Sequence, residues 1–549
     1  MSADRGTGSS DYDVIIIGSG PNALAIGAYL SRAKQRVLLL EKRFEAGGGL
    51  ATEQVTLPDF YHNTHAIYQL MVDYAPVYRD FSFEARYGVN HIFPDLQVAM
   101  PVGDGRILCI HRDVEETCRS LAQFSARDAD SYRAMHHSFD AMMRHILAPQ
   151  TYVPMEGAIE MAERADETEL GRQLNEYAEK TPEEIVSDLF EDDHVRTLML
   201  YMACHWGLEY DQPGVSYMVP IYLDRMSNHR ITAGGSHRVS SALLKSIFEH
   251  AGQIRTDARV ERILTEGGRA RGVLMEDGTR LTAAKAVVST IDVHQTFLDY
   301  VGEDDLDPDF AQSIRDWEWE EWSLSNVHLA LSEPPRFEAA KASPELDRAL
   351  LYLIGYDDMA QLMDHWDAMR TGALPDDAGC IACFPSVHDA FQAPPGRATG
   401  LLTQMAPFEL AEGGSERWLD YAERRDVVAR RVSLLQRYAP NLTQDKVLWT
   451  YLTTPADIQN KFANMVRGSY KQGAYNSLQM GYLRPNAECS HNRTPIEGLY
   501  VGGASVAPGG MVLFGPGYNC SNAIAEDFGI DKWWREPDFV TSARESGYI

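Results

Sequence analysis

The sequence has few cysteines, no excess of positive charge and no long hydrophobic run. Seven cysteines are scattered over 549 residues, which argues against a disulfide-stabilised secreted fold. Lysine and arginine number 50 against 79 aspartates and glutamates, and the net charge of -29 disfavours binding to nucleic acid or anionic lipid. No segment reaches the ~18–20 apolar residues that a membrane-spanning helix needs. We therefore expect a cytoplasmic protein with no nucleic-acid partner, for which only peripheral membrane contact stays open.

The chain begins with the polar segment MSADRGTGSS, which lacks the apolar stretch of a secretion signal. We expect residues 1–10 to be a disordered lead-in. The one close cysteine pair, Cys380 and Cys383, lies in the apolar run AGCIACFPS with no second pair or histidine cluster beside it. A buried strand is therefore favoured over a redox or metal site, and we expect no bound metal.

A βαβ unit is predicted near the N-terminus. Residues 14–17 have the β-branched pattern of a strand buried on both faces, and this run ends at Gly18. Small and apolar residues then recur at helical spacing from 22 to 31, and residues 37–40 form a second apolar strand closed by Glu41. Strand, glycine turn, helix, strand and terminal acid together predict a Rossmann-like dinucleotide-binding unit in an α/β protein.

The turn of this unit is suited to a pyrophosphate. Gly18 and Gly20 allow a tight turn and close approach of the backbone, and the helix that follows offers free N–H groups to negative charge. Ala23 stands at the third glycine position of the fingerprint, where a methyl group still permits close helix–strand packing. Glu41 is placed to accept hydrogen bonds from a ribose hydroxyl.

Three further segments point to the same kind of ligand. Residues 47–49 are three consecutive glycines, and the segment from 498 to 517 is rich in glycine but interrupted by apolar residues throughout. Such a composition favours close approach of backbone to a ligand over a flexible linker. Residues 252–289 alternate apolar and polar residues between glycine turns, which predicts an antiparallel meander that leads back to the sheet.

These segments, together with DARVERI, TPADI, LRP and TPIEGLYVGGA, resemble the phytoene desaturase-related FAD oxidoreductases over roughly residues 13–527. Within that family the chain is most similar to bacterial proteins that resemble the human pyridine nucleotide-disulphide oxidoreductase domain-containing protein two. The resemblance implies FAD as the cofactor and a GR2-type flavoprotein fold, in which a Rossmann-like FAD-binding domain carries an inserted α+β substrate domain.

The same resemblance implies which residues line FAD, with the isoalloxazine near residues 510–512. These are Gly18, Gly20, Asn22, Ala23, Glu41, Lys42, Arg43, Gly48, Gly49, Val260, Gly503, Ala504, Gly510, Met511, Val512 and Asn519. One departure matters: relatives often carry Thr-His before Pro-Gly-Gly, whereas here Val506 and Ala507 precede Pro508. A role for a histidine at that place therefore does not transfer to this chain.

The order of the motifs implies a discontinuous domain plan. We expect an FAD-binding domain and a substrate-binding domain, with ligand pockets favoured at their interface. The first combines residues 11–73, 231–291 and 485–535, and the second combines residues 74–230 and 292–484, before a C-terminal tail of residues 536–549. Within the second, the run DWEWEEW at residues 316–322 alternates apolar and acidic residues, which predicts a half-buried strand.

Candidates for proton transfer lie in two segments that mix aromatic and polar residues. FYHNTHAIYQL contains His65, and YMACHWGLEYDQPGVSYMVPIY contains His205, Glu209, Tyr210 and Asp211. Each of these residue types can accept or donate a proton beside a flavin. The sequence does not choose among the five.

The chain has no Cys-x4-Cys pair after the βαβ unit and no second complete GxGxxG unit, which disfavours a disulfide reductase. We expect an FAD-dependent dehydrogenase or desaturase that acts on carbon–carbon bonds of an apolar molecule, such as a cyclic or isoprenoid one, by hydride transfer to flavin N5. The electrons then pass to oxygen, a quinone or a carrier. An amine oxidase, a saturase or isomerase, and a non-catalytic flavin-bearing interaction protein stay as alternatives, and the sequence does not define the oligomeric state.

Overall fold

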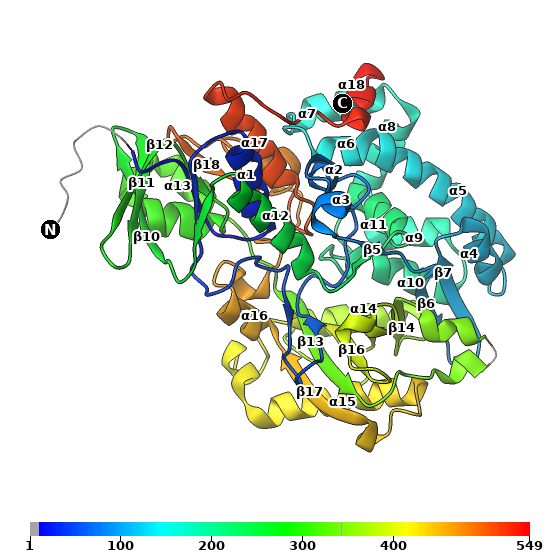
Figure 1. Cartoon of the computed structure of the whole chain (residues 1–549). Helices are drawn as coiled ribbons and strands as arrows, with labels where there is room; N and C mark the ends of the chain where they lie inside the picture. Colours follow the sequence, from blue (N-terminus) through cyan, green and yellow to red (C-terminus); the bar gives the residue numbers. More distant parts are fainter. Residues whose placement is uncertain (1–9, 342) are drawn as a thin grey trace.

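The computed structural model describes residues 10–341 and 343–549 and builds them around two large sheets (Figure 1). The disordered lead-in expected for residues 1–10 lies, except for Ser10, outside the described residues. Within the described part of the chain, no helix is long and apolar enough to cross a membrane.

The first sheet is the predicted parallel sheet. Its parallel strands lie in the order β18, β12, β1, β2, β9, and β10 and β11 add an antiparallel extension to β12. The strands are β1 (Tyr12–Ile17), β2 (Val37–Leu40), β9 (Gln253–Arg255), β10 (Val260–Glu266), β11 (Arg269–Met275), β12 (Arg280–Ser289) and β18 (Leu499–Val501). Segments far apart in the sequence thus meet in one sheet, and the meander predicted for residues 252–289 is confirmed.

Three helices pack beside this sheet. Helix α1 (Pro21–Arg32) contacts both α12 (His237–Glu249) and α17 (Gly515–Asp527), as Figure 1 shows. The helix predicted for residues 22–31 is therefore confirmed. Gly27 lets α1 approach β2 closely, because a Cβ at Gly27 would lie 2.9 Å from Leu39 Cδ1.

The second sheet has seven strands in the order β17, β13, β16, β15, β14, β6, β7. They are β6 (Leu96–Pro101), β7 (Ile107–His111), β13 (Trp322–Leu331), β14 (Leu351–Ile354), β15 (Cys380–Cys383), β16 (Ala398–Pro407) and β17 (Val447–Thr453). The buried strand predicted around Cys380 and Cys383 is confirmed. The strand predicted for residues 316–322 is wrong, because only Trp322 enters β13. Trp317 instead donates a hydrogen bond to the Gln472 carbonyl at 3.2 Å, which holds this stretch against a loop.

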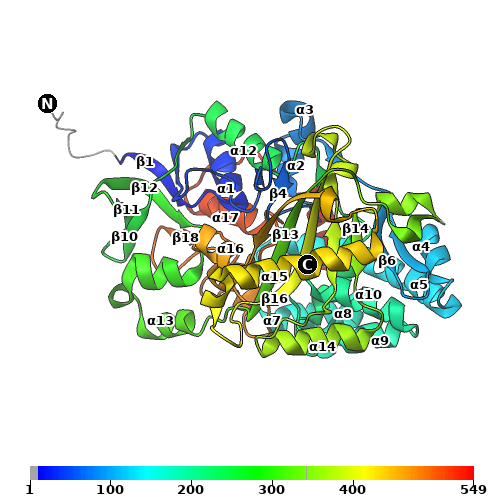
Figure 2. The same ribbon diagram turned by 90° about the horizontal axis from the view of Figure 1, so that it is seen from below.

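Helices cover both faces of the second sheet. The face that carries Tyr352, Ile354 and Ala382 packs on α15 (Tyr421–Tyr438), which crosses the sheet in Figure 2. The opposite face, with Leu353 and Ile381, packs towards the helical region on the right of Figure 1. That region comprises α4 (Val114–Leu121), α5 (Ala126–Met142), α6 (Ala148–Thr151), α7 (Ala158–Asp166), α8 (Glu169–Glu179), α9 (Pro182–Leu189), α10 (Asp193–Cys204) and α11 (Val219–Arg225). The last helix, α18 (Asp538–Glu545), packs against α6.

Candidate cofactor and substrate cavity

A cavity of about 420 Å³ runs from the glycine turn after β1 to the inner face of the second sheet. Its wall combines residues from the first βαβ unit, from the loop after the glycine run at 47–49, from the segment 458–472 and from the glycine-rich segment near residue 510. The volume lies within the ~300–1,000 Å³ that is usual for ligand pockets. One end therefore belongs to the dinucleotide-binding unit and the other to the second sheet.

The glycines at the first end leave room for a ligand against the backbone. Gly18 has φ +99°, which favours glycine, and a Cβ there would lie 2.6 Å from Thr290 Oγ1. Gly48 has φ +55°, and its Cβ would lie 2.9 Å from Gly20 Cα, so the two glycine segments touch. A Cβ at Gly20 would meet no protein atom within 4 Å. The space beside Gly20 is thus open and faces the cavity.

The N-terminus of α1 meets this open space. Gly20 is its N-cap, Pro21 is its first residue, and the first turn carries no acidic side chain. Free backbone N–H groups at a helix N-terminus favour a phosphate group. Asn22 Oδ1 accepts a hydrogen bond from the Gly517 N–H at 3.3 Å, which brings the start of α17 to the same place.

Glu41, at the end of β2, is held in a fixed orientation. Its Oε2 accepts a hydrogen bond from Ser19 Oγ at 2.5 Å, and its Oε1 accepts one from the Arg43 backbone N–H at 2.8 Å. Val260 and Lys42 line the same end of the cavity, and burial lowers the pKa of Lys42. A carboxylate in this position suits a ribose hydroxyl, as the sequence predicts.

The glycine-rich segment near residue 510 has a strained backbone. Met511, Val512 and Phe514 all have positive φ, at 69°, 56° and 61°. Such conformations cost roughly 1–3 kcal/mol each outside glycine and cluster at ligand-binding sites. Met511 and Val512 line the cavity beside Gly510. The open space at Gly20, the free helix terminus, the fixed acid and this strained loop together fit an FAD molecule.

Most of the sequence-predicted cofactor residues line this one cavity. They are Gly18, Gly20, Asn22, Ala23, Glu41, Lys42, Arg43, Gly48, Gly49, Val260, Ala504, Gly510, Met511 and Val512. The other two do not line it. Gly503 packs on Thr290, since a Cβ there would lie 2.5 Å from the Thr290 carbonyl oxygen, and Asn519 Nδ2 donates to the Val153 carbonyl at 3.2 Å. Gly503 therefore packs behind Thr290, which itself lines the cavity.

The five proton-transfer candidates separate into two groups. His65 and His205 line the cavity. Glu209, Tyr210 and Asp211 do not, because each is held elsewhere: Arg370 pairs with Glu209 at 2.7 Å and with Asp211 at 2.6 Å, and the Tyr210 hydroxyl donates to Asp367 at 2.9 Å. We correct the prediction for these three residues, since their side chains form a polar network outside the cavity wall.

His205 is a neutral histidine with a defined tautomer. Its Nδ1 donates to the Tyr201 carbonyl oxygen at 3.0 Å, so Nε2 carries a lone pair, and no described residue hydrogen-bonds to it. Burial lowers the pKa of His205 to about 4. Burial, with Lys461 and Arg43 nearby, also lowers the pKa of His65 well below its ordinary value.

The inner end of the cavity is mainly apolar and aromatic. Its wall includes Tyr68, Tyr201, Trp206, Leu324, Leu351, Ile381 and Tyr470. We call this part the inner chamber. The carboxylates among the described cavity residues are Glu41 and Glu45, which follow β2 at the cofactor end.

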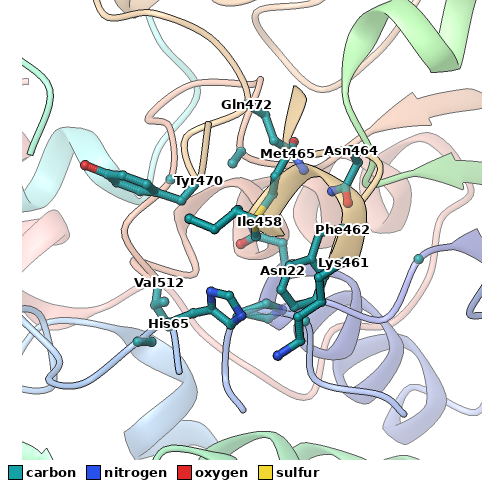
Figure 3. Close-up of a pocket in the computed structure, with 18 of the residues that line it drawn as sticks. Asn22, His65, Ile458, Lys461, Phe462, Asn464, Met465, Tyr470, Gln472 and Val512 are labelled. Atoms are coloured by element: carbon teal, nitrogen blue, oxygen red, sulfur yellow. The ribbon is translucent and has the colours of Figure 1, made fainter. Parts of the chain in front are cut away.

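The segment after the TPADI motif contributes wall residues that sequence reasoning missed. Figure 3 shows Lys461 and Phe462 facing His65 and Asn22, with Tyr470 farther along the cavity. The His65 and Phe462 rings meet edge to face with centroids 4.8 Å apart, and Lys461 forms an ion pair with Glu53. TPADI itself carries the signal, because Thr454 and Asp457 form the capping box that starts α16 (Pro455–Lys461) and so directs this segment.

Comparison with known proteins identifies the family. The model of the flavin-containing amine oxidoreductases matches residues 24–513. The chain belongs to this family. It is 37% identical to a subunit of limonene dehydrogenase from Castellaniella defragrans, over 98% of each chain.

Relatives of lower sequence identity also match most of the chain. Pyridine nucleotide-disulfide oxidoreductase domain-containing protein 2 from Rattus norvegicus is 25% identical over 96% of this chain and 95% of its own length. A lycopene-forming phytoene desaturase from a Paracoccus species is 24% identical over 90% and 93%. Among solved structures, cyclohexylamine oxidase from Brevibacterium oxydans superposes with a TM-score of 0.58 at 16% identity, over 94% and 100% of the two chains.

These findings confirm the predicted resemblance, the Rossmann-like flavoprotein fold and FAD as the cofactor. The protein is an FAD-dependent oxidoreductase of the superfamily that contains both amine oxidases and carotenoid desaturases.

Proposed function

We propose that the protein is an FAD-dependent dehydrogenase that oxidises a carbon–carbon unit of an apolar cyclic molecule of terpene size. The inner chamber carries this proposal, because its apolar and aromatic wall suits a neutral hydrocarbon skeleton. The limonene dehydrogenase relative supports the same substrate class across nearly the full length of the chain. Since that relative is a subunit, a partner chain that receives the electrons is also part of the proposal.

FAD, when bound, supplies the two-electron acceptor for a hydride that leaves a substrate C–H bond. The chain's own residues bind the substrate, exclude water and accept the second proton. Leu324, Leu351 and Ile381 from the second sheet hold the apolar skeleton and exclude water from it. His205 Nε2 is the atom to which we assign the second proton, because its lone pair is free and its side chain lines the chamber.

His205 is preferred over His65 on electrostatic grounds. The positive charges of Lys461 and Arg43 lie near His65 and oppose its protonation, whereas the main opposition to protonation of His205 is burial. As the hydride leaves, positive charge develops on the substrate carbon and makes the neighbouring C–H bond acidic, so even a weakly basic imidazole at His205 can accept that proton. His65 then serves the cofactor end of the cavity, beside Gly49.

The test is the anaerobic reduction of the purified holoenzyme, followed by the loss of flavin absorbance near ~450 nm, which reports the redox step. At least one member of a panel of cyclic terpenes and their ketone and alcohol derivatives is expected to bleach the flavin, and cyclohexylamine is not. Bleaching by the amine alone, with release of ammonia and of peroxide in air, would instead identify an amine oxidase. Bound flavin that no compound of either class bleaches would contradict a catalytic role in this chemistry.

A further inference from the structure

Two polar side chains interrupt the apolar floor of the inner chamber. Asn326 on β13 and Thr403 on β16 lie opposite each other in the antiparallel register, and both line the cavity. Ile381 on β15 is the next residue in the same row, opposite Thr403. Leu324 precedes Asn326 by two residues and therefore lies on the same face. The polar pair thus sits within an apolar surface.

A hydrogen bond orients the Asn326 amide. Thr403 Oγ1 donates to Asn326 Oδ1 at 2.8 Å, so the oxygen side of the amide is engaged. Among the described residues, no acceptor takes a hydrogen bond from Asn326 Nδ2. The two residues are only 7% and 8% exposed. A donor on the wall of an apolar cavity that has no protein acceptor can be satisfied only by water or by an acceptor atom on a bound ligand.

A second observation concerns two tyrosines on the wall of the same cavity. The side chains of Tyr201 and Tyr470 line the cavity, and their hydroxyls are buried without a hydrogen-bond partner among the described residues. Tyr201 is only 1% exposed. The Trp206 ring contacts both Tyr68 and Tyr470, with centroids 5.6 Å and 6.4 Å apart, so these two phenols lie near each other. The chamber therefore holds several unsatisfied donors inside an apolar shell.

We propose that the substrate is an oxygenated cyclic terpenoid, a ketone or an alcohol, whose oxygen accepts a hydrogen bond from Asn326 Nδ2, with Tyr201 and Tyr470 as further donors in the same chamber. This inference rests on the proposed function and narrows its substrate class. A plain hydrocarbon of the same shape would leave these donors unpaired. Sites built to hydrogen-bond a substrate oxygen discriminate strongly against analogues that lack it.

The test compares two ligands with one carbon skeleton, p-menthane and menthone, which differ by a carbonyl oxygen. Both are titrated calorimetrically into dithionite-reduced holoenzyme, which has no oxidising flavin and finds no alkene to reduce. We expect Asn326→Leu and Tyr201→Phe each to lower the ratio of the p-menthane Kd to the menthone Kd by about fivefold to tenfold, as the loss of one buried hydrogen bond implies.

The chain offers two matched controls. Ser325→Ala removes a buried, unpartnered hydroxyl from the same strand, one residue from Asn326 and on the other face of the sheet. Tyr222→Phe removes a buried, unpartnered phenol hydroxyl that does not line the cavity. Neither control should change the ratio. Retained FAD absorbance and wild-type circular dichroism show that each variant has folded.

A ratio that stays at the wild-type value in both test variants would overturn the inference. Should Asn326→Leu lose FAD, Tyr201→Phe decides the outcome alone. A separate measurement tests the proposed function. It compares how terpenes and cyclohexylamine bleach the flavin of the oxidised enzyme, and it does not depend on the Kd ratio. Terpene bleaching with an unchanged Kd ratio would retain the dehydrogenase and reject the oxygen contact.

Discussion

Gly20 and Gly48 offer a direct test of how the glycine segments serve the cofactor. The two residues touch each other, but their surroundings differ. Gly20 has φ -67° and ψ 179°, which alanine adopts without strain, and a Cβ there meets no protein atom within 4 Å. Gly48 has φ +55°, and a Cβ there would lie 2.9 Å from Gly20 Cα. Alanine at the first position should therefore disturb the ligand, and alanine at the second should disturb the protein.

The magnitudes follow from these contacts. For Gly20→Ala, the weaker N-cap costs about 1 kcal/mol, and the smaller entropy of the unfolded chain offsets about 0.4–1 kcal/mol of it. The free energy of unfolding of the apoprotein should thus change by less than about 1 kcal/mol. The same methyl occupies space next to the pyrophosphate, and overpacking of about 1–3 kcal/mol weakens FAD binding by roughly fivefold to 150-fold. Gly48→Ala should destabilise the apoprotein itself by about 1–3 kcal/mol.

Two measurements separate these effects. Denaturant unfolding of the deflavinated protein gives the stability of each variant, and quenching of FAD fluorescence on titration gives its FAD affinity. We expect Gly20→Ala to keep wild-type apoprotein stability while it loses affinity. Wild-type FAD affinity in Gly20→Ala would refute the assignment of the open space at Gly20 to the pyrophosphate.

Three other outcomes are expected. His205→Gln should slow anaerobic bleaching by about a hundredfold or more, whereas His365→Gln, at a buried histidine outside the cavity, should not. Because the pKa of His205 is about 4, the wild-type bleaching rate should be level from about pH 5 to 8 and fall below about pH 4. Burial raises the pKa of Asp292 to about 7, so its folded form binds the proton more tightly and stability falls as pH rises from about 4 to 7. Asp292→Asn should remove that fall and add at most about 4 kcal/mol at pH 8, measured by denaturant unfolding at several pH values.

The parts of the fold that local patterns determine were predictable. The strands and the helix predicted between residues 13 and 41 are present in the structure as β1, α1 and β2. They were predictable because an apolar run, a glycine turn and helical spacing are all short-range signals. The strand predicted for residues 316–322 was wrong because a tertiary contact determines the conformation of this segment. Trp317 bonds to the loop at Gln472, a contact between residues 155 positions apart that no alternation of residues reveals.

The candidate site divides in the same way. Glycines that allow close approach of the backbone form its cofactor end, and such glycine segments can be recognised in the sequence. The structure places these residues on the wall of one cavity. Its substrate end uses side chains from strands that are distant in the sequence, such as Asn326 and Thr403. Glu209 and Asp211 had the residue types of a base, but Arg370 lies in another helix and its pairing with them could not be read from their own segment.

Family membership alone does not separate amines from hydrocarbons, since both occur as substrates within it, but the placement of charge in the cavity does bear on the choice. An ammonium group that enters the inner chamber loses its hydration, at a cost of several kcal/mol. The lining carboxylates Glu41 and Glu45 lie at the cofactor end, and Glu41 already accepts two hydrogen bonds there. Cation–π contact with Tyr68 or Trp206 recovers about 2 kcal/mol or somewhat more in a desolvated site, which offsets only part of a cost of several kcal/mol. A neutral ligand meets no such penalty, and for that reason we favour a terpenoid over an amine as the substrate.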